Sequence, residues 1–475
     1  MVLMNTLKAI SEEDMDWIHG ASLKILAETG VVFHNEEALA IFKKHGAKLN
    51  GQTVYLPKKM VNQALETSPE TYRWRARNDA HSVTVGDKKE KLLLQPNGGP
   101  VFIQDLDKGR RPATLEDFAN IIKICQASKE VGLVGSFPVE PGDVRQEEKH
   151  LRMMYETLKN TDKPLIATET SGVKVGQMLD MVEIALGHEE FLRDNYCVAV
   201  AVTPTSPLTY ESAPCETVIE FARHNQPIFF TVAIMAGFSG PISLIGTAIL
   251  QNAEILAGIT LAQLVNPGNP VVYSNGSTVA NMKSGNFISA SPEMMLIQLA
   301  GIQMSLDYYH LPARSMCGMT DAKIIDCQAG YETMQNLMMG VLGGAHLVFE
   351  CLGVLDAIMT TSCEKLVIDL EIVSRVMRLR EGMDTTDKEQ AVNVIQEIGH
   401  QGSYITHLNT LTHFRERWLP GLSDWESYAS WQEKGSEDVA AKANRKFKEI
   451  LQSTPQTLID PEVDQALNDY IRRAL

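Results

Sequence analysis

The chain of 475 residues has a net charge of −16, and hydrophobic residues make up 44% of it. This length and apolar fraction allow a large interior, as in barrel enzymes of more than about 250 residues. An acidic chain repels phosphate backbones, so nucleic acid is not expected as a partner. Seven cysteines are scattered without a CxxC pair, which is typical of a reducing compartment.

The first segment of the chain, residues 1–90, mixes a helical pattern with short strand patterns. Residues 11–29 predict a helix that ends at Gly30. Short strands are predicted near Val54 and Val83. We expect this segment to wrap a central domain, because no glycine- or serine-rich linker separates it from the rest.

Residues 91–362 alternate between short apolar runs and stretches with helical period. Buried parallel strands have such short, nearly continuous apolar sequences. The runs are residues 92–95, 133–137, 165–169, 197–202, 228–232, 271–275, 313–317 and 347–351. Eight strands alternating with helices predict an α/β fold, a (β/α)8 TIM barrel with α+β and helical extensions. A doubly wound open sheet is the alternative, because the alternation alone does not establish closure.

Helix start signals support the alternation within the predicted barrel. Thr114 and Asp117 form a capping-box pattern before an apolar period. Ser291 followed by Pro292 is a cap with proline in the first turn. The segment after the barrel, residues 363–475, is polar and helical and is expected to wrap the barrel.

Two features of the chain bear on its location. Glu12, Glu13 and Asp14 interrupt any secretory signal pattern near the amino terminus. Apolar stretches such as residues 253–265 are too short or too punctuated to span a bilayer. We therefore expect a cytoplasmic protein with no membrane partner.

Carboxylates stand at two predicted strand ends, where barrel enzymes place their reactive groups. Glu169 and Glu350 each end an apolar run, and a charge there is costly unless it has a partner. If Glu350 points inward, period-two alternation directs Val348 and His346 inward as well. Either carboxylate faces a cationic ligand, or it accepts hydrogen bonds from loop amides or a lysine.

Aromatic side chains lie near the same predicted rim, among them Phe137 and Tyr273. Aromatic faces bind quaternary ammonium groups, which cannot donate hydrogen bonds. The alternative is that these rings fill the core. The loop after the seventh strand carries Asp321 and Lys323, and polar loops of this kind commonly carry function. Asp321 or Asp326 could instead cap the next helix.

Several cofactor motifs are missing from the sequence. There is no phosphate-binding loop and no G-x-G-x-x-G after a strand. There is no H-E-x-x-H motif or close His/Cys cluster, so no metal is expected in this chain. A resident corrinoid requires an Asp-x-His-x-x-Gly segment, and Asp79-Ala80-His81 is followed by a glycine only at Gly86.

Four segments resemble the trimethylamine methyltransferase superfamily. They are the loop TDAKIIDCQAGYE at residues 320–332, the pair Leu56-Pro57, the run Asn97-Gly98-Gly99 and the tail HLNTLTHFRERW at residues 407–418. The likeness extends from about residue 10 to about residue 435. Archaeal members carry pyrrolysine near the loop, where this chain has only ordinary residues such as Lys323. The chain therefore resembles the branch without pyrrolysine, whose members demethylate quaternary amines.

The resemblance implies a reaction in one-carbon metabolism. A methyl group passes from a small quaternary amine, with glycine betaine giving dimethylglycine as the first expectation, to Co(I) of a separate corrinoid protein. The corrinoid belongs to that partner, and this chain is expected to form a homo-oligomer.

A zwitterion such as glycine betaine requires an acidic or aromatic wall and donors for its carboxylate. Glu350 and Asp321 are the expected catalytic residues. The expected substrate-binding residues are Phe137, Tyr273, Asn275, Lys323, Asn97, Gly98, Gly99 and Glu169. Arg314 is a weaker donor candidate, because it comes early in its strand.

Other functions remain open from the sequence. The same chemistry could act on proline betaine, carnitine, choline or γ-butyrobetaine. A zinc-dependent barrel methyltransferase would carry stoichiometric zinc. A non-catalytic barrel that only captures betaines would not transfer methyl to free cob(I)alamin.

Overall fold

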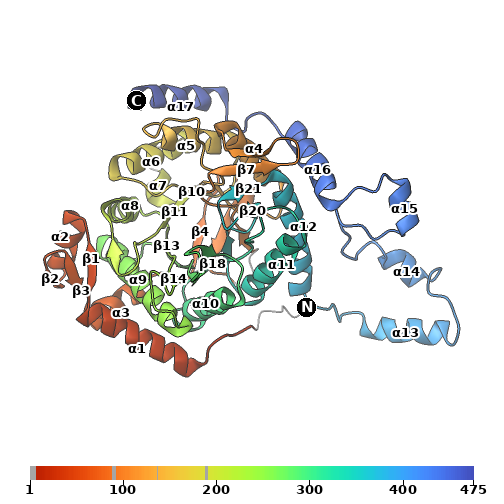
Figure 1. Cartoon of the computed structure of the whole chain (residues 1–475), viewed down its shortest axis with the longest axis horizontal. Coiled ribbons are helices and arrows are strands. Elements are labelled where there is room, and N and C mark those ends of the chain that lie inside the picture. Colours follow the sequence, from red (N-terminus) through yellow and green to blue (C-terminus); the bar gives the residue numbers. More distant parts are fainter. Residues whose placement is uncertain (1–6, 88–91, 136, 188–190) are drawn as a thin grey trace.

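A closed barrel of eight parallel strands forms the centre of the computed structural model, which describes residues 7–87, 92–135, 137–187 and 191–475. Helices surround the strands in a ring (Figure 1). The strands run β6-β19-β18-β15-β13-β11-β10-β9 around the sheet. A parallel bridge joins Leu94, in the first of them, to Val131, which lies just before the last. The predicted barrel is confirmed, and the open-sheet alternative is wrong.

The eight predicted apolar runs each contain one barrel strand, in chain order; residue 136, in the second run, lies outside the described residues. The strands are β6 (Leu93–Leu94), β9 (Val134–Gly135), β10 (Leu165–Ala167), β11 (Val198–Val202), β13 (Ile228–Val232), β15 (Val271–Asn275), β18 (Ala313–Met316) and β19 (Leu347–Phe349). Every neighbouring pair is parallel, so all carboxyl ends meet at one rim.

Eight main helices pack around these strands. They are α4 (Leu115–Ala127), α5 (Lys149–Asn160), α6 (Gly172–Leu186), α8 (Ser212–Arg223), α9 (Leu244–Val265), α10 (Pro292–Gln303), α11 (Cys327–Leu342) and α12 (Cys363–Arg380), with the short α7 (Phe191–Asp194) after α6 and a π-helical turn (Met304–Tyr308) after α10. The predicted caps at Thr114 and Ser291 are confirmed. The ring includes α12, which the boundary expected at residue 363 had placed in the carboxyl-terminal extension.

One ring helix, α9, is long and apolar enough to cross a membrane by length and composition. Its apolar window is 78% buried within the protein, where it packs against α1 (Glu12–Glu28), α3 (Lys58–Thr67) and α8. A helix that is apolar on all sides and buried in this way is typical of the core of a large protein.

A hairpin closes the amino-terminal end of the barrel. It consists of β4 (Tyr72–Trp74) and β5 (Val83–Val85). The Trp74 indole is fully buried and donates to the carbonyl of Cys197 at 3.1 Å. Its ring meets Phe229 edge-on, with centroids 5.7 Å apart. Apolar side chains from the barrel strands complete this layer, so the end is sealed.

Smaller elements decorate the ring. The amino-terminal segment adds β1 (Val31–Phe33), α2 (Glu36–Lys44), β2 (Lys48–Asn50), β3 (Thr53–Tyr55) and a 3-10 turn (Asp79–His81), with β1 pairing beside β12 (Thr209–Tyr210). Loops after the barrel strands add β7 (Phe102–Asp105), β8 (Gly109–Pro112), β14 (Met235–Ala236), β16 (Thr278–Ala280), β17 (Phe287–Ile288), β20 (Val354–Leu355) and β21 (Thr360–Thr361).

The carboxyl-terminal segment divides into two parts. Helix α16 (Val439–Ser453) packs on α12 and α4, and α17 (Pro461–Ala474) packs on α6 and α5. Residues 383–436 do not wrap the barrel as expected. They carry α13 (Lys388–Ile398), α14 (Leu408–His413) and α15 (Tyr428–Glu433) and project away from the ring (Figure 1). We call residues 383–436 the arm.

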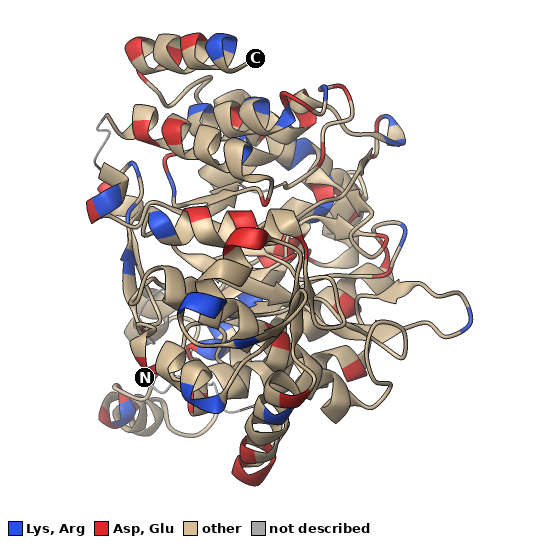
Figure 2. Ribbon diagram, turned by 90° about the vertical axis from the view of Figure 1, so that its left-hand side faces the viewer, with Lys and Arg blue, Asp and Glu red and all other residues tan. Residues whose placement is uncertain are grey.

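Charged residues of both signs alternate along the ribbon. Figure 2 shows acidic and basic positions interspersed on the helices of one side of the molecule.

Candidate functional site

Glu350 lies at the carboxyl rim of the barrel, directly after β19. Its carboxylate Oε2 accepts the backbone N–H of Gly98 at 2.7 Å. The same N–H also lies 2.9 Å from Asn97 Oδ1. A Cβ atom on Gly98 would lie 2.5 Å from Glu350 Oε1. The structure therefore brings three of the predicted site residues together, and the carboxyl group fills the space that a Cβ at residue 98 would take.

Burial controls the protonation of Glu350. It raises the pKa of this carboxyl to about 8, against the opposing effects of the Gly98 N–H and the nearby Arg314 charge. Desolvation disfavours the charged form unless a cation compensates it. At neutral pH the empty site therefore holds mainly a neutral carboxyl, which a bound cation would ionise.

Arg314 lies inside the barrel on β18. Its guanidinium donates to Gln95 Oε1, Thr231 Oγ1 and Ser274 Oγ at 2.7–3.2 Å and lies 3.6 Å from the centroid of the Phe349 ring. Each of these acceptors is a neutral oxygen, so within the described chain the cation in the lumen has no directly bonded anion. Burial lowers the pKa of Arg314 to about 9.

The alternation predicted for the last strand is wrong. Phe349 faces Arg314 inside the barrel, whereas Val348 packs in the outer core between sheet and helices. Glu350 has φ +54°, a left-handed conformation that breaks the period of two. Its carboxyl group reaches the rim through this backbone turn and not through strand alternation.

Phe137, Gly99 and Glu169 lie at the ends of neighbouring strands. The N–H of Gly99 donates to the carbonyl of Phe137 at 2.7 Å, and Phe137 is half-buried. Glu169 accepts the N–H of Thr203 at 2.7 Å. Burial raises the pKa of Glu169 to about 7, so a second carboxyl of this rim titrates near neutrality.

Tyr273 and Asn275 face the helix layer and not the lumen, which corrects their predicted place. The Tyr273 hydroxyl donates to Asn252 Oδ1 at 2.9 Å, and Asn275 Oδ1 accepts from Gln251 Nε2 at 3.0 Å. Both partners belong to α9. Because Ser274 bonds Arg314 inside the barrel, its two strand neighbours must point outward.

Asp321 and Lys323 hold loops in place. The carboxylate of Asp321 accepts the N–H of Ser289 at 3.0 Å and its hydroxyl at 3.2 Å. Lys323 is exposed and pairs with Asp356 at 2.9 Å. Asp326 caps α11 by accepting from Ala329 N at 3.0 Å. These contacts assign Asp321 and Lys323 to loop anchoring and place neither beside Glu350.

The side-chain amide of Asn97 is the one polar group of this cluster left unsatisfied. Its Nδ2 atom is buried and has no hydrogen-bond partner within the described chain. A buried donor without a partner costs free energy, so the Asn97 amide is able to donate to a further acceptor. Sequence reasoning missed the polar lumen beneath it, since Gln95, Thr231 and Ser274 sit inside otherwise apolar strands.

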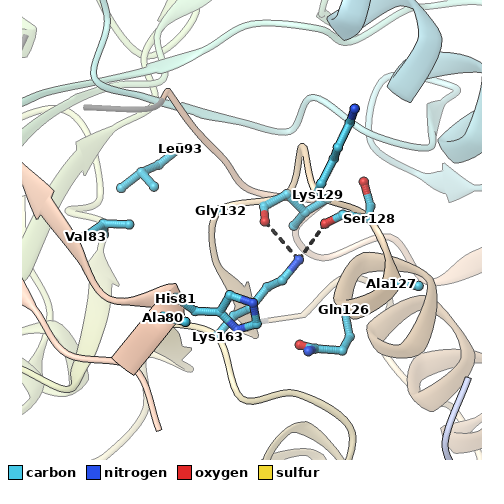
Figure 3. Close-up of a pocket in the computed structure, with 11 residues that line it drawn as sticks. Ala80, His81, Val83, Leu93, Gln126, Ala127, Ser128, Lys129, Gly132 and Lys163 are labelled. Atoms are coloured by element: carbon cyan, nitrogen blue, oxygen red, sulfur yellow. Dashed lines mark hydrogen bonds between the residues drawn. The ribbon is translucent and has the colours of Figure 1, made fainter. Parts of the chain in front are cut away.

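A cavity of about 350 Å³ lies at the opposite end of the barrel, between the β5 hairpin and the loop before β9. In Figure 3 the Lys163 side chain points toward the loop that carries Ser128 and Gly132. Its ammonium donates to the carbonyls of Cys125, Ser128 and Val131 at 2.6–3.0 Å. The amino-terminal face of a barrel usually serves stability, and this lysine ties a helix end to the next strand.

Comparison with known proteins agrees with this architecture. Residues 2–474 match the family model described as trimethylamine methyltransferase. A glycine betaine methyltransferase of Desulfitobacterium hafniense is 33% identical over 99% of this chain and 97% of its own. A proline betaine:corrinoid methyltransferase of Eubacterium limosum is 33% identical over 87% of each chain.

The solved monomethylamine methyltransferase of Methanosarcina barkeri has the same fold, with a TM-score of 0.53 and 12% identity over 93% of this chain and 89% of that one. The family match and these relatives show that the chain is a corrinoid-dependent methyltransferase. The chain belongs to the trimethylamine methyltransferase family.

Proposed function

We propose that the protein transfers a methyl group from glycine betaine to the corrinoid of a separate protein. Relatives that act on betaines, one of them named for its corrinoid acceptor, support methyl transfer from a quaternary amine. The observation that carries the choice of a zwitterion is the rim itself. Asn97 and Glu350 meet at the Gly98 N–H, and the Arg314 charge acts on Glu350; these groups support a site that takes both charges of a zwitterion.

The ammonium end of the substrate is assigned to Glu350 and the Phe137 ring, with Glu169 on the same rim. A quaternary ammonium offers no N–H, so only charge and aromatic faces attract it, at about 0.5–2 kcal/mol for each cation–π contact. The Glu350 carboxyl, neutral in the empty site, loses its proton when the cation binds. Affinity for the substrate should therefore rise about tenfold per pH unit from pH 6 toward pH 8 and then level off.

The carboxylate end is assigned to the Asn97 amide, in the field of Arg314. Each charge of the zwitterion then meets an opposite charge or a donor, and neither is buried uncompensated. Choline lacks the carboxylate, so it leaves the Asn97 donor unsatisfied and binds more weakly.

Methyl transfer needs no proton at the leaving group. The corrinoid of the partner protein supplies the cobalt nucleophile that accepts the methyl. The N–CH3 bond breaks with both electrons on nitrogen, so the departing amine nitrogen is neutral. This chain holds the substrate with one methyl group directed out of the rim, since correct alignment can supply several kcal/mol. Once the cationic charge is gone, Glu350 takes up a proton again, which favours product release.

The test uses the purified chain, free cob(I)alamin and a panel of quaternary amines, with methylcobalamin formation followed by absorbance. Glycine betaine should be turned over well and choline poorly. Asn97→Ala should raise the KM for glycine betaine at least tenfold, the loss of one hydrogen bond to a charged group at about 1.5–3 kcal/mol. It should leave the KM for choline unchanged.

Tyr273→Phe is the matched control, because it removes a buried hydroxyl outside the lumen. It should leave KM unchanged. Equal turnover of choline and glycine betaine would refute the carboxylate site. No transfer from any quaternary amine would refute the function. Proline betaine shares the same charges, and its rate relative to glycine betaine shows which betaine the rim prefers.

A further inference from the structure

The loop after β19 carries Glu350 and concentrates backbone strain. In the described part of the chain nine non-glycine residues have a positive φ, and four of them lie between residues 350 and 358. They are Glu350, Asp356, Ala357 and Ile358. Such conformations are unfavourable for residues with a side chain and persist only where the surroundings fix them. The loop therefore depends on contacts outside itself for its shape.

A buried ion pair on α12 holds this loop at Gly353. Lys365 and Asp369 form the pair, and their side chains are 1% and 0% exposed. Asp369 Oδ2 accepts the N–H of Gly353 at 2.8 Å, and the Lys365 ammonium donates to Thr333 Oγ1 on α11 at 2.9 Å. The N–H of Ser362, the N-cap of α12, donates to the Gly353 carbonyl at 2.9 Å. Both backbone polar groups of Gly353 are thus bonded to α12 and its cap.

Gly353 also lies in close contact with the residues around the start of α12. It has φ +82°, and a Cβ atom there would lie 3.1 Å from both the Ser362 carbonyl oxygen and Thr361 Oγ1. Strand β20, which follows it directly, packs on α12 (Figure 1). The loop is therefore attached to this helix shortly after Glu350.

Stability alone does not explain a buried ion pair at this place. Removing two charges from water has a desolvation cost that their attraction offsets only with excellent geometry, and apolar residues of similar volume are often at least as stabilising. Apolar side chains could fill the same volume, but they could not accept the Gly353 N–H. The feature that distinguishes the pair is thus its bond to the loop of Glu350.

We propose that Lys365 and Asp369 are positioning residues for Glu350 in the methyl-transfer reaction. Asp369 fixes Gly353, and Lys365 keeps the Asp369 carboxylate ionised and oriented as an acceptor. The loop then holds the Glu350 carboxyl against the Gly98 N–H. Neither residue of the pair touches the substrate. Because this proposal rests on the proposed function of Glu350, its test includes a measurement that needs no substrate.

The first experiment compares two double variants of the full chain, assayed with glycine betaine and free cob(I)alamin. Lys365→Met/Asp369→Leu removes both charges and the acceptor for the Gly353 N–H. Lys365→Met/Asp369→Asn removes both charges but keeps an amide oxygen as acceptor. The leucine variant should raise KM about 10- to 100-fold, because Glu350 is misplaced. The asparagine variant should restore most of the affinity.

Val373→Ala is the matched control on the same helix. Val373 is buried in the core under α12, so its truncation leaves a cavity and lowers stability. It should lower the urea midpoint of unfolding and leave KM unchanged. The leucine variant should show the reverse, with a midpoint at or above that of the wild type and a raised KM.

The substrate-free measurement follows the titration of Glu350. Burial raises the pKa of this carboxyl to about 8 from an ordinary value of 4.5. A loop released from α12 exposes the carboxyl to water, so its pKa should fall toward the ordinary value. Adding Glu350→Gln to the leucine variant should then no longer stabilise it above pH 8. Thermal unfolding between pH 4 and pH 9, with and without Glu350→Gln, measures this.

A leucine variant with the KM of the wild type and an unshifted Glu350 titration would overturn the proposal, and so would an asparagine variant as impaired as the leucine variant. A wild type that transfers methyl from no quaternary amine would instead refute the proposed function, and the Glu350 titration would still decide the positioning role. If the leucine variant does not fold, amide exchange in the wild type decides. The Gly353 amide should exchange as slowly as those of the barrel strands, and rapid exchange there would contradict the proposal.

Discussion

The two ends of the barrel are built on opposite principles. At the amino-terminal end Trp74 fills the lumen, and the Lys163 ammonium is saturated by three carbonyls. At the carboxyl rim Glu350 is buried with a raised pKa, and the Asn97 amide has no partner in the described chain. The sealed end thus combines a large buried ring with a fully bonded cation, whereas the rim carries a carboxyl that titrates near neutrality and an unpaired donor.

The largest expected effect on stability comes from a change at the amino-terminal end of the barrel, which Trp74 fills. Trp74→Ala should lower the free energy of unfolding by about 3–5 kcal/mol, because it removes a large buried ring and leaves a cavity. The KM for glycine betaine in the fraction that remains folded should stay within about twofold. Urea unfolding and initial rates test this. A selective rise in KM without loss of stability would show that the two ends are not separate.

Glu350→Gln should have the next largest effect, and of opposite sign. A carboxyl whose pKa rises from 4.5 to about 8 on folding stabilises the folded state fully below pH 4.5. That contribution is lost as the pH rises to about 8. The glutamine variant lacks this loss, so above pH 8 it should be more stable than the wild type by a few kcal/mol.

Thermal unfolding across pH 4–9 checks the prediction for Glu350→Gln. Its turnover of glycine betaine should fall, and the rise of affinity with pH should disappear. An unchanged slope of stability against pH would contradict the buried-carboxyl interpretation.

Gly98→Ala should affect the rim more than the fold. The new methyl group would stand 2.5 Å from Glu350 Oε1 and would displace the carboxyl. We expect a 10- to 100-fold rise in KM, roughly 1.4–2.8 kcal/mol, and an overpacking cost of about 1–3 kcal/mol in stability. Gly330→Ala is the control, because a methyl group there meets open space within α11. Equal kinetics for the two variants would argue against the rim.

Lys323→Ala should have the smallest effect. Lys323 is exposed and pairs with Asp356, and surface pairs contribute about 0–1 kcal/mol. KM for glycine betaine should be unchanged, which a steady-state assay can show. A tenfold rise would return Lys323 to the substrate site where the sequence first placed it.

The barrel was predictable because its signals are local and repeated. Eight apolar runs and caps such as Ser291 specify strands and helices without knowledge of the tertiary structure. The cluster of Asn97, Gly98 and Glu350 was also within reach, since parallel strands bring their ends to one rim.

Whether an individual strand side chain points into the lumen or toward the helices was less predictable. Tyr273 and Asn275 stand in the same five-residue strand as Ser274, and because all five residues are buried, the pattern gives no sign of which of them faces the lumen. Glu350 does not follow the period-two alternation of the strand, because its backbone has a left-handed conformation. Arg314 was a weaker candidate because it comes early in its strand. Inside the barrel, the side chains of Gln95, Thr231 and Ser274 accept hydrogen bonds from its guanidinium and so stabilise the cation there.

The bridge that closes the barrel also defines where the barrel can loosen. Strands β13 and β15 pair over five residues, but β6 has two residues and meets the chain before β9 through Leu94 and Val131. The Gly99–Phe137 hydrogen bond continues this seam up to the rim. Local opening requires the least free energy where few bonds must break. The seam beside the proposed site is therefore one place where the barrel wall should open locally at low free-energy cost.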